Sequence, residues 1–147
     1  MSIGFPTLIG GFIHNCGALE LFINNTIRAF ATDSLLSANL IKSPLYKRIV
    51  LLRQLLHDRS CIGKEVIDSL CNELEEIRKQ RNIVAHNPFV STEPNGTGTE
   101  EILVLRYKPV GVDSPDKLTK EDVARLVTKT KDLMIKFTKL IPEATKT

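Results

Sequence analysis

A stripe of apolar residues at helical spacing runs through residues 64–85 and constrains the chain more than any other feature. It consists of Ile67, Leu70, Leu74 and Ile77. Steps of three and four residues place side chains on one face of an α-helix. The next position on that face holds Arg81, and Val84 follows it. Because an unpaired buried charge is costly, we expect Arg81 either to meet an acidic partner or to line a cavity.

Polar side chains gather around Arg81 at the end of the same expected helix. Asn82 and His86 are four residues apart and share a helix face, with Arg78 one turn before them. Pro88 disfavours a helical conformation at the residue before it, so we expect His86 in the last helical turn or just beyond. Arginine, asparagine and histidine side chains together are able to hold a phosphate and move a proton.

Apolar residues recur at the same spacing elsewhere in the chain, which predicts further helices. We expect these helices at about residues 8–30 (or 12–30), 34–41, 43–57 and 119–140. In the first of them the predicted core-facing residues are Phe12, Cys16, Leu19, Ile23, Ile27 and Phe30. Glu20 lies beside this stripe, and a glutamate there would reach a buried arginine of a neighbouring helix. The alternative for Glu20 is an exposed carboxylate on the flank of the helix.

Capping and stop signals set the ends of several expected helices. Ser43 precedes Pro44, as a capping serine precedes a proline at the first helical position. Thr119 and Asp122 resemble a capping box, with aspartate in place of the usual glutamate. Pro142 is expected to end the last helix.

The helix at residues 43–57 is expected to turn Arg48 outward, together with Lys47 and Arg53. His57 falls at its end, where the helix dipole favours a cation. We prefer that explanation of His57 to a role as a ligand.

Between the last two long helices lies a segment with loop composition, residues 87–98, which is rich in Pro, Gly, Ser and Thr. Glu101–Tyr107 then reads as a β-strand, and Phe89-Val90 is its nearest candidate partner. The predicted fold is therefore all-α, a four-helix bundle with a small β-hairpin inserted between helices three and four. A single domain is expected to span residues 1–147.

Composition excludes several classes of protein. The formal net charge of +3 is mild and permits nucleic-acid binding without indicating it. The three cysteines have no C-x-x-C pair, so we expect buried free thiols, a reducing compartment and no bound metal. The apolar N-terminus lacks the basic residues of a secretory signal and is too interrupted to span a membrane. We therefore expect a soluble cytoplasmic protein without a metal or other cofactor.

The segment Arg81-Asn82-Ile83-Val84-Ala85-His86 resembles the signature of the HEPN superfamily. That signature is an arginine, a polar residue, a short spacer and a histidine at the end of the third helix of a four-helix bundle. Arg81, Asn82 and His86 match its positions without departure. The layout of the helices resembles the family more loosely over the whole chain, and the strand at 101–107 has no counterpart that we can match.

The resemblance implies a metal-independent endoribonuclease, often a toxin or a defence effector, that acts as a homodimer on RNA. It implies Arg81 and His86 as catalytic residues, with Asn82 assisting them. Arg78 is a weaker candidate for contact with the RNA backbone. A nucleotidyltransferase-type antitoxin is a possible partner in such systems.

Two other interpretations remain open from the sequence. One is a catalytically inactive HEPN-like module that binds nucleotides or regulates a partner. The other is a plain helical interaction protein, in which Arg81 is a buried structural ion paired with Glu20 or with a partner chain.

Overall fold

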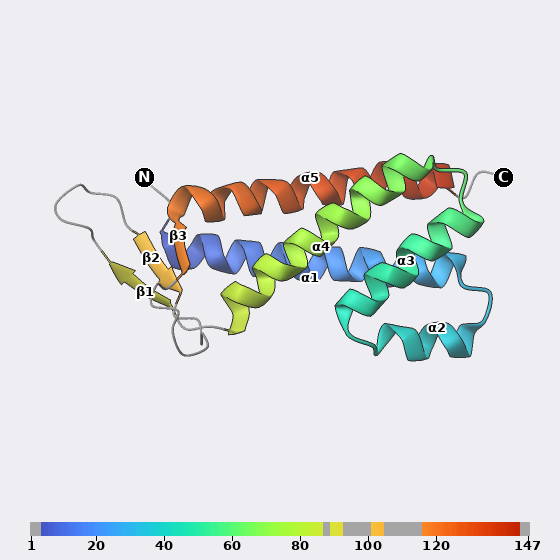
Figure 1. Cartoon of the computed structure of the whole chain (residues 1–147), viewed down its shortest axis with the longest axis horizontal. Coiled ribbons are helices and arrows are strands. Elements are labelled where there is room, and N and C mark those ends of the chain that lie inside the picture. Colours follow the sequence, from blue (N-terminus) through green and yellow to red (C-terminus); the bar gives the residue numbers. More distant parts are fainter. Residues whose placement is uncertain (1–3, 87–88, 93–100, 105–115, 145–147) are drawn as a thin grey trace.

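The computed structural model describes residues 4–86, 89–92, 101–104 and 116–144. It describes only the backbone of the strand residues other than Thr119 and of seven helical residues: Phe5, Ser34, Leu36, Ser37, His86, Glu143 and Ala144. Most of these residues are helical, which confirms the predicted all-α class. The described part contains the helices α1 (Phe5–Phe30), α2 (Ser34–Ile41), α3 (Leu45–Arg59), α4 (Lys64–His86) and α5 (Lys120–Ala144) (Figure 1). No helix in this part is long and apolar enough to cross a membrane.

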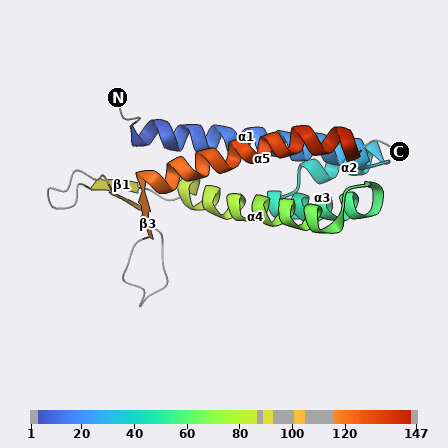
Figure 2. The same ribbon diagram turned by 90° about the horizontal axis from the view of Figure 1, so that it is seen from above.

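The long helices pack against one another through their apolar stripes. Helix α1 contacts α5, α3 and α4, and α3 contacts α4. In both views α1 and α5 lie side by side (Figure 1 and Figure 2). The predicted stripe of α1 is buried at every position: Phe12, Cys16, Leu19, Ile23, Ile27 and Phe30. The stripe of α4 is likewise buried at Ile67, Leu70, Leu74, Ile77 and Val84. The periodicity therefore identified the buried faces of α1 and α4 correctly.

Three short strands lie between α4 and α5 in the chain and at one end of the molecule (Figure 1). They are β1 (Phe89–Thr92), β2 (Glu101–Val104) and β3 (Asp116–Thr119), paired antiparallel in the order β1-β2-β3. Residues 105–107 of the expected strand at 101–107 lie outside the described residues. Strand β3 was not expected from the sequence; it continues directly into α5.

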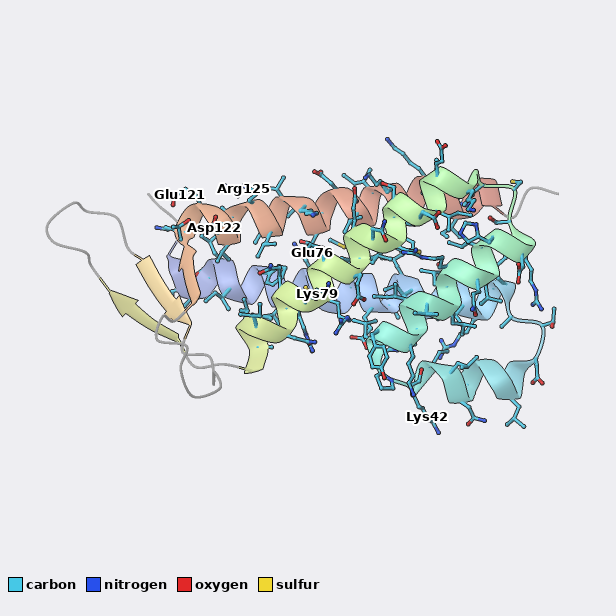
Figure 3. The ribbon with its side chains drawn as sticks, in the orientation of Figure 1. Lys42, Glu76, Lys79, Glu121, Asp122 and Arg125 are labelled. Carbon is cyan, nitrogen blue, oxygen red and sulfur yellow. The ribbon has the colours of Figure 1, made fainter. Side chains whose placement is uncertain are left out.

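The start of α5 is held by a reciprocal pair of hydrogen bonds. The backbone N–H of Thr119 donates to Oδ2 of Asp122 at 2.9 Å, and the N–H of Asp122 donates to Oγ1 of Thr119 at 3.1 Å. Figure 3 shows Asp122 at this end of the helix, beside Glu121 and Arg125. The predicted capping box is therefore confirmed.

Other predicted helix ends were wrong. Helix α1 begins at Phe5, before Leu8, because Pro6 is compatible with a first turn. Ser43 does not cap α3; its hydroxyl donates to the carbonyl of Leu40, and Pro44 takes the N-cap position. Pro142 lies inside α5, which continues to Ala144. The carbonyl four residues earlier, which loses its backbone donor, belongs to an exposed residue.

Candidate functional site

Arg81 lies near the end of α4, in line with the buried stripe of that helix. Arg81 is half-buried. Its side chain borders a cavity of about 20 Å³, together with Cys16, Glu20, Leu45 and Arg78 among others. Such a volume suits about one water molecule and is too small for a phosphate. A phosphate held by Arg81 must therefore approach from the outer side of the guanidinium.

The prediction that Glu20 pairs with Arg81 was wrong. Oε1 of Glu20 lies 2.5 Å from Nη2 of Arg48, and the Arg48 side chain is only 8% exposed. Arg48 also donates to Oδ1 of Asn24 at 2.8 Å and to the carbonyl of Ser43 at 3.0 Å. Arg48 was expected to point outward, but α1 packs against α3 and supplies two of its acceptors, Glu20 and Asn24.

A sequence signal for Arg48 did exist. Arg48 follows Leu45 by three residues and precedes Leu52 by four. Those steps place the arginine on the same helix face as the two leucines, so a buried position was available to it. The signal was missed because a charged residue is usually exposed.

With Glu20 held by Arg48, Arg81 has no carboxylate within ion-pair distance among the described residues. Its Nη1 donates to Oδ1 of Asn82, a long contact of 3.4 Å. Burial raises the pKa of the Cys16 thiol to about 12; the nearby Arg81 guanidinium opposes that rise, and Glu20 adds to it. The acceptor that Arg81 contacts among the described residues is therefore the Asn82 amide oxygen rather than a carboxylate.

His86 is the last residue of α4, so its predicted place in the last helical turn is confirmed. Its side chain is outside the described part, as are Asn87 and Pro88. Arg81 and Asn82 precede it on the same helix by five and four residues. The backbone thus carries the motif residues within the final turns of one helix.

Arg78, expected to contact RNA, is held within the chain. Its Nε donates to Oε2 of Glu75 at 2.9 Å, and its Nη2 donates to Oε1 of the same carboxylate. This pair raises the pKa of Arg78 and lowers that of Glu75. The guanidinium also lies over the ring of Tyr46, with Cζ 5.8 Å from the ring centroid. Arg78 is therefore fixed in orientation, between an acid and an aromatic ring.

His57 lies in the last turn of α3, as predicted, but it also makes a contact that the sequence did not indicate. Its Nε2 lies 2.9 Å from Oδ1 of Asp68 on α4. That hydrogen bond is the main reason why the pKa of Asp68 lies below its ordinary value. Arg53 adds a contact of 3.8 Å to the same carboxylate oxygen. These groups join α3 to α4 far from Arg81 along the helix.

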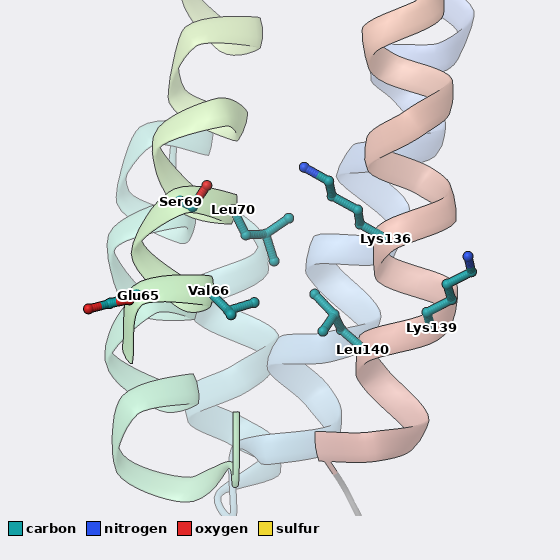
Figure 4. A pocket seen from close by; sticks show the side chains of 7 residues that line it. All are labelled: Glu65, Val66, Ser69, Leu70, Lys136, Lys139 and Leu140. Carbon is teal, nitrogen blue, oxygen red and sulfur yellow. The ribbon is translucent and has the colours of Figure 1, made fainter. Parts of the chain in front are cut away.

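A separate groove of about 410 Å³ lies between α4 and α5. Val66 and Leu70 of α4 face Leu140 of α5 across it, with Lys136 and Lys139 on the α5 side (Figure 4). It lies near the start of α4, whereas Arg81 lies near the end of that helix. The groove is therefore not part of the Arg81 site.

Within the described part of the chain, no group of three or more His, Cys, Asp or Glu residues is arranged to hold a metal ion. In the comparisons with known proteins, no family model, no curated protein and no solved structure matches the chain.

Proposed function

We propose that this protein is a metal-independent endoribonuclease of the HEPN type that acts as a homodimer. In this proposal α1, α3, α4 and α5 form the four-helix bundle of the family, α2 is a short addition, and the strands are an insertion between α4 and α5. The catalytic residues are Arg81 and His86, assisted by Asn82. The whole chain, residues 1–147, forms the one domain.

The observation that supports the proposal most is that Arg81 is half-buried and has no carboxylate partner among the described residues. It occupies a position between the buried residues Ile77 and Val84, yet no described carboxylate pairs with it. Glu20, the acid expected to pair with it, accepts a hydrogen bond from Arg48 instead. A half-buried guanidinium without an acid is suited to bind an external anion, and its planar donors match phosphate oxygens. This argues against Arg81 as a structural ion paired with Glu20.

The chemistry assigned to the motif needs only groups of the protein and of RNA. The ribose 2′-OH attacks the adjacent phosphorus, the P–O5′ bond breaks, and a 2′,3′-cyclic phosphate forms. His86 of one protomer accepts the 2′-OH proton, and the partner subunit's His86 donates a proton to the leaving 5′-oxygen. Proton transfer by one such group contributes about 10²–10⁴-fold. Arg81 stabilises the non-bridging oxygens, and Asn82 orients the imidazole.

The homodimer follows from the need for two proton-transfer groups. One chain supplies one motif histidine, and pairing about a two-fold axis brings two copies together. The 20 Å³ cavity of one chain is too small for a phosphate, so in this proposal the phosphate lies between the Arg81 side chains of the two protomers. In the cell we propose a cytoplasmic toxin or defence effector, with a nucleotidyltransferase-type antitoxin as its candidate partner.

The proposal is tested by incubating the purified protein with single-stranded RNA in EDTA. We expect cleavage, products with 2′,3′-cyclic phosphate ends, and loss of cleavage in His86→Ala while the protein stays folded and dimeric. Cleavage that EDTA abolishes, or that His86→Ala retains, contradicts the mechanism. RNA binding without cleavage by wild-type protein supports the inactive binding module instead.

A further inference from the structure

An exposed aromatic ring lies beside the candidate site at the start of α3. Tyr46 is 47% exposed. The Arg78 guanidinium lies 5.8 Å from its ring centroid, and the Lys47 ammonium lies 6.0 Å from it. An aromatic ring near cations and open to solvent is a surface on which nucleobases stack, since every base has a π-face.

Tyr46 is close to the motif through two neighbours. Leu45, the residue before it, borders the same small cavity as Arg78 and Arg81. Arg78 itself lies one helical turn before Arg81 on α4. The ring therefore lies next to the part of α4 from which Arg81 would hold a phosphate.

The orientation of Arg78, the cation next to the Tyr46 ring, is fixed. Glu75 holds Arg78 through two hydrogen bonds, which use its Nε and Nη2. A guanidinium held in this way presents its plane rather than its full set of donors, so it acts here as a stacking group more than as a phosphate ligand. This changes the role expected for Arg78 from backbone contact to positioning of Tyr46.

We propose that Tyr46, positioned by Arg78, is the stacking platform for a nucleobase next to the phosphate that Arg81 would hold. The inference rests on the proposed RNA substrate but not on cleavage. Charge favours RNA as the occupant: Lys47 beside the ring and Lys42 before the helix are both exposed, while the Glu75 carboxylate is paired with Arg78. Unpaired bases of single-stranded RNA are free to stack on aromatic side chains.

The chain offers a direct optical probe of this contact, because it contains two tyrosines and no tryptophan. In a Tyr107→Phe background, Tyr46 is the one tyrosine fluorophore left. Titration of His86→Ala, Tyr107→Phe protein with a single-stranded oligoribonucleotide should quench this fluorescence. An oligonucleotide with an abasic nucleotide at the contacted position should bind without that quenching.

Affinity provides the second measurement. Tyr46→Ala should weaken binding of the oligoribonucleotide by about 5- to 150-fold, the range for loss of one base–aromatic stack, and Tyr46→Phe should retain most of it. The abasic oligonucleotide should lose affinity for the Tyr46 protein and not for Tyr46→Ala. Val50→Ala, which alters another exposed residue of α3, should bind as the parent does.

Equal affinity of the Tyr46→Ala and parent proteins for RNA would overturn the inference, whether or not the protein cleaves. Conversion of a dimer to a monomer by Tyr46→Ala, with no change in the abasic-site dependence, would also overturn it and assign the ring to an interface between copies. Tyr46-dependent binding without cleavage would uphold the inference while the nuclease proposal failed.

Discussion

The carboxylate of Glu20 on α1 is held by the guanidinium of Arg48 on α3, with Oε1 and Nη2 2.5 Å apart. This ion pair joins two helices. Glu20, which the sequence suggested as the partner of Arg81, therefore pairs with Arg48 instead. Arg48 stabilises the fold, whereas we assign Arg81 to RNA binding.

Replacement of Arg48 should therefore be destabilising. Arg48→Met leaves the Glu20 carboxylate, the Asn24 amide oxygen and the Ser43 carbonyl without a donor. We expect urea unfolding to show a loss of about 2–3 kcal/mol, below the full value for a buried pair because the Glu20 side chain is 35% exposed. Arg125→Met, which alters an arginine with a side chain 76% exposed, should change the free energy of unfolding by less than about 0.5 kcal/mol. Equal effects of the two substitutions would contradict the assigned role of Arg48.

Acid should weaken the contact between α3 and α4. The pKa of Asp68 lies below its ordinary value of 3.8, chiefly because of the hydrogen bond with His57. The stabilisation that this shift supplies is complete above pH 3.8 and is lost as the pH falls through the lower pKa of the folded state. In urea unfolding at pH 7 and near pH 3, Asp68→Asn should reduce the difference in stability between the two pH values. Asp132→Asn, an exposed position on α5, should leave that difference as in wild type; an equal reduction would refute the prediction.

The three thiols should differ in reactivity. Cys61 is exposed, whereas Cys16 and Cys71 are buried. Burial raises the pKa of Cys16 to about 12 and also raises that of Cys71, so neither supplies the reactive thiolate at neutral pH. A disulfide reagent should label Cys61 quickly in the folded protein, and Cys16 and Cys71 only when the protein unfolds. Cys61→Ser should remove the fast phase, and a fast phase that survives this substitution would show that a buried thiol is accessible.

The capping box should contribute measurably to α5. Thr119→Ala removes the hydroxyl that accepts the N–H of Asp122, and loss of a cap of this kind costs about 1 kcal/mol. Thermal or urea unfolding measures this loss. The matched control is Thr128→Ala, an exposed threonine inside the same helix, where alanine is the better helix former and stability should not fall. A smaller loss at Thr119 than at Thr128 would go against the capping role.

The sequence predicted those parts of the fold that depend on local pattern. The stripes of α1 and α4 follow from spacing alone, because helical geometry fixes which residues share a face. The Thr119–Asp122 cap was likewise predictable from residue types three positions apart. Strand β3 was not, since Asp116-Lys117-Leu118-Thr119 lacks the run of β-branched or aromatic residues typical of a strand.

Contacts between helices could not be predicted from the periodicity of apolar residues. Whether Glu20 meets Arg48 or Arg81 depends on how closely α3 and α4 each approach α1, which periodicity along one helix does not report. The same holds for Tyr46 over Arg78 and for His57 with Asp68. Arg81 and Asn82 were found because the arginine interrupts an apolar stripe, a signal contained in one helix.

The most direct test of the central claim measures stability and RNA cleavage on the same samples of Arg81→Met, which keeps the apolar stem and removes the charge. If Arg81 is a phosphate ligand rather than part of the fold, cleavage in EDTA should fall by about 100-fold or more. The free energy of unfolding should change by less than about 1 kcal/mol. A loss of stability as large as that of Arg48→Met, or a wild-type protein that leaves RNA uncut in EDTA, would contradict the claim.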